Sequence, residues 1–377
     1  MGALYLHIPF CISKCPYCDF FSEVGQQQQI DDYVEQLKRN IKIASTQDSQ
    51  PLSLDTLFFG GGTPSLLSVN QLADVLRCIV RYFGINPAAE ITIEANPGTL
   101  SLEKLKGYRQ AGVNRLSLGI QSLDDHRLQQ LGRIHTVAQA RESIISARAA
   151  GFDNLSLDLM FALPNQDLLA LESEIAELLT FKPEHVSVYG LSYEEGTDFF
   201  LRQQAGKIRS CDEGLYADMY LLLHNYLVAA GYNHYEISNF AKPDSLCRHN
   251  QVYWKRENCL AIGAGAHGFQ DQHWGKRWHV EADLNHYKEC LIQGKDPVKL
   301  LEQYDRDGAM KEYAYLRLRT SKGIDVQEFY RRFGLEFQDV FAPAILKTKD
   351  YLYASGQRRF FDVNGWLIYD HLISNFI

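Results

Sequence analysis

The 377-residue sequence contains no apolar run of about 18 residues, the length needed to cross a bilayer, so we expect no membrane span. It also lacks the basic start, apolar stretch and small-residue cleavage site of a signal peptide. Basic residues are fewer than acidic ones, 38 against 46, and the formal net charge of −8 argues against a broad surface for nucleic acids or acidic membranes. We therefore expect a cytoplasmic protein whose partner is a small metabolite or another protein.

Most of the eight cysteines are scattered without a repeated spacing, which suits reduced thiols in a cytosol. The exception is a C-x3-C-x2-C run, which directly follows an apolar segment at residues 2–8 that we expect to be a strand. Three thiolates so close in sequence can bind one face of a 4Fe–4S cube and leave its fourth iron without a protein ligand. The run consists of Cys11, Cys15 and Cys18, and the scattered cysteines are Cys78, Cys211, Cys247, Cys259 and Cys290.

Two simpler interpretations of this run stay open. A zinc site normally closes with four ligands in paired spacings, and no second pair follows at a suitable distance, which makes zinc the weaker hypothesis. Three buried structural cysteines are the other alternative, although Pro16 and the short spacing predict a loop, for which a core has little use.

The chain is long enough, and with 46% hydrophobic residues apolar enough, for a barrel of about 200 to 250 residues and a smaller appendage. Apolar segments alternate with segments of helical period, which predicts βαβ units, a parallel sheet and right-handed crossovers. The pattern fits an α/β protein with a partial (β/α)6 barrel. Strands are expected at 2–8, 54–59, 90–96, 115–122, 154–164 and 184–192, and helices at 29–46, 68–83, 101–111, 136–150 and 168–180.

Two sequence features, a glycine loop and polar residues at strand ends, predict where a ligand binds in this sheet. Gly60 to Gly62 and Thr63 follow the second strand, and glycines let a backbone approach a ligand and leave amides free to bind polar atoms. Polar residues also stand within or at the ends of later strands, and parallel strands carry their site at the carboxyl ends. These residues are Glu94, Asn96, Gln121, Ser122, Asp158 and Ser192.

The cysteine run after a first strand and the GGGTP sequence at residues 60–64 resemble the radical S-adenosylmethionine (SAM) superfamily. The resemblance implies a radical SAM barrel in which Cys11, Cys15 and Cys18 hold a 4Fe–4S cluster, while the methionine end of SAM chelates the fourth iron. It also implies that Tyr17 packs near the adenine, and that the methionine amino group contacts the glycine loop, at Gly61, Gly62 and Thr63.

Within the superfamily, the chain resembles the coproporphyrinogen-dehydrogenase-like branch. Arg133, in the sequence L-G-R-I-H, would hold the methionine carboxylate by a charge-assisted pair, and Gln121 and Asp158 would bind ribose hydroxyls. The resemblance implies SAM contacts at Tyr5, Glu94, Gln121, Arg133, Asp158 and Ser192. It assigns no residue a catalytic role.

Three later sequences, YEISNFAKP, C-R-H-N-x2-Y-W and GAGAHG, are similar to the heme chaperones of the HemW group. This implies a protein of porphyrin metabolism that binds heme and delivers it to acceptor proteins, including membrane-bound ones by transient contact, as a monomer or a homodimer. A histidine beside aromatics is more often a hydrogen-bonded core residue, but neutral imidazole is also a usual heme ligand, and Tyr and Trp faces suit a flat macrocycle. The residues implied to bind heme are His249, Asn250, Tyr253 and Trp254.

The rival function is that of an oxygen-independent coproporphyrinogen III dehydrogenase, a radical SAM enzyme of heme biosynthesis. That enzyme has a further cysteine two positions after the third cluster cysteine, where this chain has Phe20, and the sequence therefore favours the chaperone. A third class, a winged-helix adaptor for nucleic acids or proteins, would need a basic recognition helix that the sequence does not show.

The chain is expected to divide into a core barrel at 1–235, a strand-rich extension at 236–289 that carries the H-N-x2-Y-W sequence, and a winged-helix-like domain at 290–377. The extension should add strands near 232–238 and 259–263 to the open barrel edge. In the last domain, RRFFDV and WLIYD flank Asn364 and Gly365, which predicts a type I′ hairpin.

Overall fold

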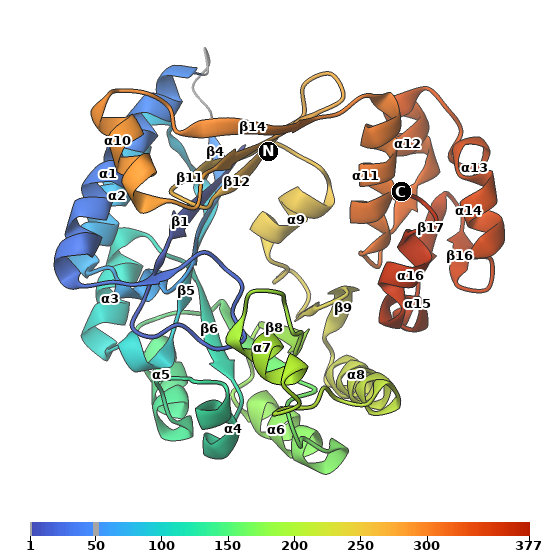
Figure 1. The fold of residues 1–377 in the computed structure, drawn as a ribbon, viewed down its shortest axis with the longest axis horizontal. Helices are drawn as coiled ribbons and strands as arrows, with labels where there is room; N and C mark the ends of the chain where they lie inside the picture. The colour runs from blue at the N-terminus through green and yellow to red at the C-terminus, as the bar shows by residue number, and fades with distance from the viewer. Residues whose placement is uncertain (1, 48–52) are drawn as a thin grey trace.

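The computed structural model describes residues 2–47 and 53–377, and its core is a curved sheet with six parallel central strands (Figure 1). Helices connect these strands as βαβ crossovers, which confirms the predicted α/β class and partial (β/α)6 barrel. The central strands are β1 (Gly2–Ile8), β4 (Leu54–Gly61), β5 (Ile85–Ala95), β6 (Arg115–Gln121), β7 (Leu155–Phe161) and β8 (His185–Gly190).

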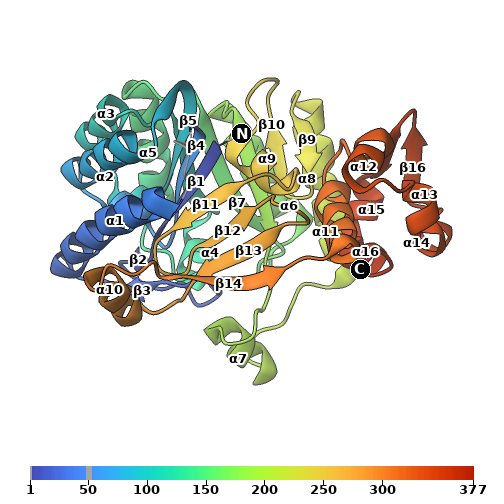
Figure 2. The same ribbon diagram turned by 90° about the horizontal axis from the view of Figure 1, so that it is seen from above.

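Most of the helices cover the outer face of the sheet and leave its inner face toward the barrel interior (Figure 1), whereas α7 lies apart from this layer, beside the cysteine loop (Figure 2). Helix α2 is typical: Ser68 and Gln71 form a capping box at its start, and four buried apolar side chains recur at helical spacing. The helices are α1 (Gln27–Gln47), α2 (Val69–Tyr82), α3 (Leu102–Ala111), α4 (Asp125–Gln130), α5 (Val137–Ala149), α6 (Leu168–Thr180), α7 (Asp198–Gln204) and α8 (Glu213–Ala229), with 3-10 turns at Pro64–Leu66 and Pro97–Thr99.

The added strands extend the sheet at both of its ends, so that it has twelve strands. Two antiparallel strands follow β8 at one end, and at the other end β11 pairs in parallel with β1 and carries three antiparallel strands beyond it (Figure 2). The strands expected near 232–238 and 259–263 are thus present, at opposite ends of the sheet. The added elements are β9 (Asn233–Glu236), β10 (Asn239–Ala241), β11 (Cys259–Ile262), β12 (His267–Gln270), β13 (Lys276–Val280), β14 (Val298–Gln303) and helix α10 (Leu284–Ile292).

Helix α9 (Arg248–Trp254) closes the amino-terminal end of the barrel. Its first two backbone amides donate to the carboxylate of Glu90, and the His249 ring bonds to Thr56. Thr56 lies near the start of β4, and Glu90 lies opposite it on β5, so α9 packs away from the carboxyl ends of these strands. The H-N-x2-Y-W sequence is therefore helical, and its carboxylate cap suits the positive end of a helix.

The C-terminal unit combines helices with a small three-stranded sheet of order β15-β17-β16, as a winged-helix-like fold would. The predicted boundary at residue 290 stays a prediction, and we note that β14, which follows it, belongs to the large sheet. The unit contains α11 (Arg306–Leu318), β15 (Ile324–Asp325), α12 (Val326–Phe333), α13 (Phe337–Val340), α14 (Ala342–Lys347), β16 (Leu352–Ser355), β17 (Arg358–Phe361), α15 (Val363–Leu367) and α16 (Tyr369–Ile373).

The predicted hairpin across Asn364 and Gly365 is wrong. The side chain of Asp362 accepts hydrogen bonds from the amides of both residues and caps α15, while the indole of Trp366 donates to the Leu318 carbonyl. These contacts place Asn364 and Gly365 in the first turn of a helix. The hairpin of this unit lies just before, between β16 and β17.

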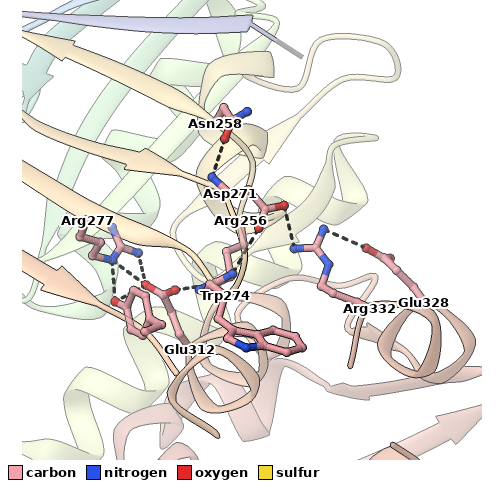
Figure 3. Close-up of polar contacts among 9 residues, drawn as sticks. Arg256, Asn258, Asp271, Trp274, Arg277, Glu312, Glu328 and Arg332 are labelled. Atoms are coloured by element: carbon pink, nitrogen blue, oxygen red, sulfur yellow. Dashed lines mark hydrogen bonds and ion pairs between the residues drawn. The ribbon is translucent and has the colours of Figure 1, made fainter. Parts of the chain in front are cut away.

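A network of charged side chains ties the C-terminal unit to the large sheet (Figure 3). Glu312 of α11 pairs with Arg256 and with Arg277 of β13, and the Arg256 side chain is only 1% exposed. Arg332 of α12 pairs with Asp271 at 3.5 Å. Because Arg256 follows α9 directly, the same network fixes the end of the helix that closes the barrel.

Within residues 2–47 and 53–377, none of the helices combines the length and the hydropathy of a membrane-spanning segment.

Candidate functional site

A cavity of about 470 Å³ opens at the carboxyl ends of the parallel strands, where the sequence places the site. Its wall is made by the cysteine loop, the glycine loop and the ends of β5 to β8. The sequence predicts seventeen site residues for cluster, SAM or heme, and twelve of them line this cavity: Cys11, Cys15, Cys18, Tyr17, Gly61, Gly62, Thr63, Glu94, Gln121, Arg133, Asp158 and Ser192.

All three thiols of the cysteine loop are free, half-buried and on the cavity wall. The Thr63 hydroxyl donates to the sulfur of Cys11 at 3.4 Å, and an Arg133 nitrogen lies 3.5 Å from that of Cys15. Within the described part of the chain, no three His, Cys, Asp or Glu side chains gather around a single ion. A cluster differs from a single ion, because each thiolate binds a different iron, and the three-thiol set with nearby donors fits that group.

Backbone hydrogen bonds hold the cysteine loop between β2 (Phe10–Cys11) and β3 (Glu23–Val24). The amide of Gly62 donates to the Ile8 carbonyl at 2.8 Å, and the amide of Thr63 donates to the Phe10 carbonyl at 2.7 Å. The prediction that these amides are free for a ligand is therefore wrong. A side chain on Gly62 would come within 2.7 Å of the Phe10 oxygen, so glycine is needed for the close approach of the two loops.

Arg133 is placed to bind an anion in the cavity. One terminal nitrogen donates to the Gly119 carbonyl at 2.9 Å and the other faces Cys15, which fixes the guanidinium plane. Its Nε is buried and has no hydrogen-bond partner among the described residues. A buried donor without a partner is costly, and a carboxylate that binds the guanidinium would remove that cost.

Glu94 and Asp158 form an acidic floor to the cavity. Asp158 accepts hydrogen bonds from Ser117 and Ser156, at 3.2 Å each, while Glu94 stands next to it on β5. Burial, and then the nearby Asp158, raise the pKa of Glu94 to about 8. Burial also raises the pKa of Asp158, although its serine partners oppose that shift. At neutral pH, Glu94 therefore carries a proton and can donate a hydrogen bond to a ligand.

Replacing Glu94 with glutamine is expected to flatten the pH dependence of stability. In wild type, Glu94 keeps a proton in the folded chain that it loses in the unfolded chain between its ordinary pKa of 4.5 and about 8. The free energy of unfolding therefore falls as the pH rises through this window, and the glutamine variant escapes that fall. Urea unfolding of the cluster-free chain at about pH 5 and about pH 8 checks this. Glu103→Gln, on the exposed face of α3, is the control and should behave as wild type does. The prediction is contradicted if the free energy of unfolding changes between the two pH values by the same amount in wild type and in Glu94→Gln.

The remaining cavity residues divide into an apolar and a polar side. Tyr17 packs against Phe199 and a small apolar cluster that includes Met160 and Leu191, which makes a flat apolar wall. Gln121 ends β6 with a left-handed backbone, φ 61°, which turns its strand end into the cavity rim. A wall of this kind beside polar groups suits a ligand with one aromatic part and several hydroxyls.

Tyr5 lies elsewhere. Its ring faces a second, smaller cavity of about 210 Å³ behind the first, and its hydroxyl bonds to His7 at 3.1 Å. The predicted SAM contact of Tyr5 stays a prediction, but the residue does not line the large cavity. We call the smaller space the rear cavity. It shares Glu94, Ser117, Asp158 and Tyr189 with the large one.

The rear cavity also collects three residues of the H-N-x2-Y-W sequence: His249, Asn250 and Tyr253. The Nδ1 atom of His249 bonds to the Thr56 hydroxyl at 3.0 Å and its Nε2 to the Tyr253 hydroxyl at 2.9 Å. Burial lowers the pKa of His249 to about 3, so the ring is neutral. Trp254 instead lies under the Arg319 guanidinium of the C-terminal unit, 4.8 Å from the ring centre.

Sequence reasoning missed Tyr189 and Arg115, which line these cavities. Tyr189 of β8 is 44% exposed although its strand is otherwise mostly buried, because it projects into the open barrel. The sequence does contain a pattern that predicts this position of Tyr189. Ser187 and Tyr189 are polar residues two positions apart in an apolar strand, so both face the same side of the sheet. Arg115, at the start of β6, gave no such signal, since a first strand residue is normally at the surface.

Comparison with known proteins agrees with this geometry. The family model described as the radical SAM superfamily matches residues 5–178, and the model of the HemN C-terminal domain matches residues 304–356. The chain is similar to the heme chaperone HemW of Lactococcus lactis, at 35% identity over 100% of this chain and 97% of that protein. It is 37% identical to the HemW protein of Bacillus subtilis, over 92% and 90% of the two chains, and 41% identical to that of Haemophilus influenzae, over 88% and 86%.

Among solved structures, the radical SAM enzyme coproporphyrinogen III oxidase (HemN) from Escherichia coli superposes on the whole chain and on 89% of its own length. The TM-score is 0.84 at 22% sequence identity. This likeness shows the fold, which the two proteins share from the barrel to the C-terminal unit.

Proposed function

Because the chain belongs to the HemW family of the radical SAM superfamily, we propose that it is a heme chaperone, which binds heme and delivers it to acceptor proteins. The observation that carries this proposal is the similarity to HemW proteins along essentially the whole chain. The fold alone does not choose between chaperone and enzyme, since coproporphyrinogen III oxidase has it as well.

The radical SAM domain implies a 4Fe–4S cluster and SAM, and the large cavity offers residues for both. When bound, the cluster supplies an iron with an open coordination position, to which the methionine end of SAM binds. Cys11, Cys15 and Cys18 would hold the cluster, and the unpartnered Nε of Arg133 supports its role at the methionine carboxylate. The ten proposed SAM contacts are Tyr5, Tyr17, Gly61, Gly62, Thr63, Glu94, Gln121, Arg133, Asp158 and Ser192.

Replacing Arg133 with alanine is expected to weaken SAM binding to the cluster-loaded chain by about 1.5 to 3 kcal/mol, the cost of a hydrogen bond to a charged group. Isothermal titration calorimetry under anaerobic conditions measures this. Arg127→Ala is a matched control, because Arg127 lies on the neighbouring helix α4 and pairs with Glu174 outside the cavity lining. Wild-type SAM affinity in a folded Arg133 variant would remove the residue from the site.

We further propose that His249, Asn250, Tyr253 and Trp254 take part in heme binding, a role supported by the match to the H-N-x2-Y-W sequence. The geometry adds a condition. Both nitrogens of His249 are occupied, and so an Nε2 bond to iron requires that the Tyr253 hydroxyl first leaves. Neutral imidazole is the form that binds iron, and burial keeps the ring in that form.

Heme titration of the cluster-loaded chain, followed by the Soret band, tests the proposed function. We expect saturable binding at one heme per chain, and transfer to an apo-acceptor protein. His249→Ala should shift the band and loosen heme, whereas Tyr253→Phe frees Nε2 and should bind at least as tightly as wild type. A chain that binds no heme would refute the chaperone proposal, and an unaltered spectrum in a folded His249→Ala would send the search for the ligand to Cys247 and His267.

The rival enzyme activity is tested with coproporphyrinogen III, reductant and SAM under anaerobic conditions. We expect no decarboxylated product, because Phe20 stands at the position of the enzyme's further cysteine and has no thiol. Product formation at a useful rate would reverse the assignment. We also propose a place in porphyrin metabolism in the cytoplasm, with transient contact to membrane-bound acceptors and a homodimer as the assembled form.

A further inference from the structure

A buried cation without a partner stands in the rear cavity. Arg115 is 2% exposed, yet within residues 2–47 and 53–377 no hydrogen bond and no ion pair reaches its guanidinium. Its Nε is buried and unsatisfied. The carboxylates of Glu90 and Asp158 act on it only through space: Glu90 accepts the amides of α9, and Asp158 accepts serine hydroxyls.

An unpaired guanidinium is expensive to bury, because the charge loses its hydration and five donors lose their partners. Structural arginines of this chain avoid that cost. Arg256, which is equally buried, pairs with Glu312 and donates to the Trp274 carbonyl. Arg115 therefore differs from the buried arginine that fixes the fold, and it lines the rear cavity.

The surroundings of Arg115 select the kind of ligand. Ser117, Ser187 and Asn250 add neutral polar groups to the rear cavity, and Asp158 and Glu94 add acidic ones. Asp158 already offsets part of the Arg115 charge, so the cavity repels a doubly charged phosphate more strongly than a singly charged anion. A carboxylate also matches the planar fork of a guanidinium with two parallel hydrogen bonds.

We propose that the rear cavity is a subsite for a carboxylate, bound by the guanidinium of Arg115. At about 210 Å³ the cavity holds a small acid or the carboxylate side arm of a larger ligand. The rear cavity adjoins the large cavity, with which it shares four wall residues. Two sources supply this chemistry: a free small carboxylate, or a propionate of heme, which rests on the proposed function.

The first arm of the test uses sodium propionate on the cluster-loaded full-length chain. Propionate is expected to raise the melting temperature of wild type in a saturable way, relative to equal sodium chloride, and sodium phosphate is expected to have no such effect. In Arg115→Gln the apparent affinity for propionate should fall at least about tenfold. Arg39→Gln, the same change on the exposed face of α1, should respond as wild type does.

The second arm compares heme with heme dimethyl ester, which has the same ring and no free carboxylates. If a heme propionate is the ligand, wild type prefers heme by at least about tenfold, and Arg115→Gln loses that preference. If a free acid is the ligand, propionate protects only chains with Arg115, and the heme-to-ester ratio does not depend on the residue. Arg115→Lys keeps the charge and loses the fork, and should retain part of either effect.

The proposal is overturned if neither propionate protection nor the heme-to-ester ratio depends on Arg115, or if phosphate protects as well as propionate. If Arg115→Gln does not fold, Arg115→Lys and the wild-type responses are used in its place. A wild type that propionate does not stabilise against heat, and that binds heme and its ester with equal affinity, overturns the subsite. Failure of wild type to bind either porphyrin would refute the chaperone function and leave the propionate arm to decide on the subsite.

Discussion

Replacing Cys15 with alanine is expected to leave the reconstituted chain without a 4Fe–4S cluster, so that its charge-transfer absorption and most of the bound iron disappear. The three thiols of the cysteine loop line one cavity, and in the proposed cluster each would bind a different iron, so the loss of one would leave a second iron without a protein ligand. Iron and sulfide analysis, together with the visible spectrum after anaerobic reconstitution, measure the effect.

Cys78→Ala is the matched control for this experiment. Cys78 lies on α2, its thiol is directed at the Lys38 carbonyl, and it is no part of the cavity wall. The control should bind iron as wild type does. A full cluster in a chain that lacks Cys11, Cys15 and Cys18 together would contradict the assignment of the whole site.

Replacing Glu312 with alanine is expected to lower the free energy of unfolding by about 3 to 5 kcal/mol, because it leaves the buried Arg256 side chain without its main counter-charge. Asp271, 3.5 Å from Arg256, remains and compensates only in part. The network joins two units of the fold, so the loss should also appear as a separate early transition of the C-terminal unit. Urea unfolding followed by far-UV circular dichroism measures both effects.

Lys311→Ala, on the same helix, is the control, since Lys311 forms an exposed pair with Asp307 and its removal should leave the unfolding midpoint unchanged. An unaltered midpoint in Glu312→Ala would mean that the packing of the two units, and not this network, holds them together.

Local sequence patterns were enough to predict the barrel and most of its site. The six central strands and their helices follow from periodicities within about 20 residues, and the cysteine loop follows from a spacing of eight residues, 11–18. Because parallel strands carry their site at their carboxyl ends, polar residues at the ends of four strands could be predicted to share one cavity. Each of these inferences needs only the order of elements along the chain and the geometry of a parallel sheet.

The features that sequence reasoning could not reach depend on contacts between distant segments. Asn364 and Gly365 are typical of a hairpin turn. The contact of Trp366 with α11 and the cap formed by Asp362 stabilise a helix there instead. The amides of Gly62 and Thr63 were expected to be free, and are used instead by carbonyls about 50 residues earlier. Nothing near Arg115 in the sequence indicates that α9, more than 130 residues later, covers it.

The parallel pairing of β11 with β1 has a consequence for how the chain is made. Strand β1 finds one neighbour at once in β4, but its other edge waits for Cys259–Ile262, so the barrel cannot be completed until roughly two-thirds of the chain is synthesised. At about 5 to 20 residues per second, synthesis of the chain between the end of β4 and the start of β11 takes about 10 to 40 seconds on the ribosome. During that time the nascent chain presents an unpaired apolar strand edge, which is the kind of surface that pairs with other chains. Slow translation or a truncation before residue 259 would therefore favour aggregation, and holding that edge until β11 emerges is a task for the cell's folding machinery.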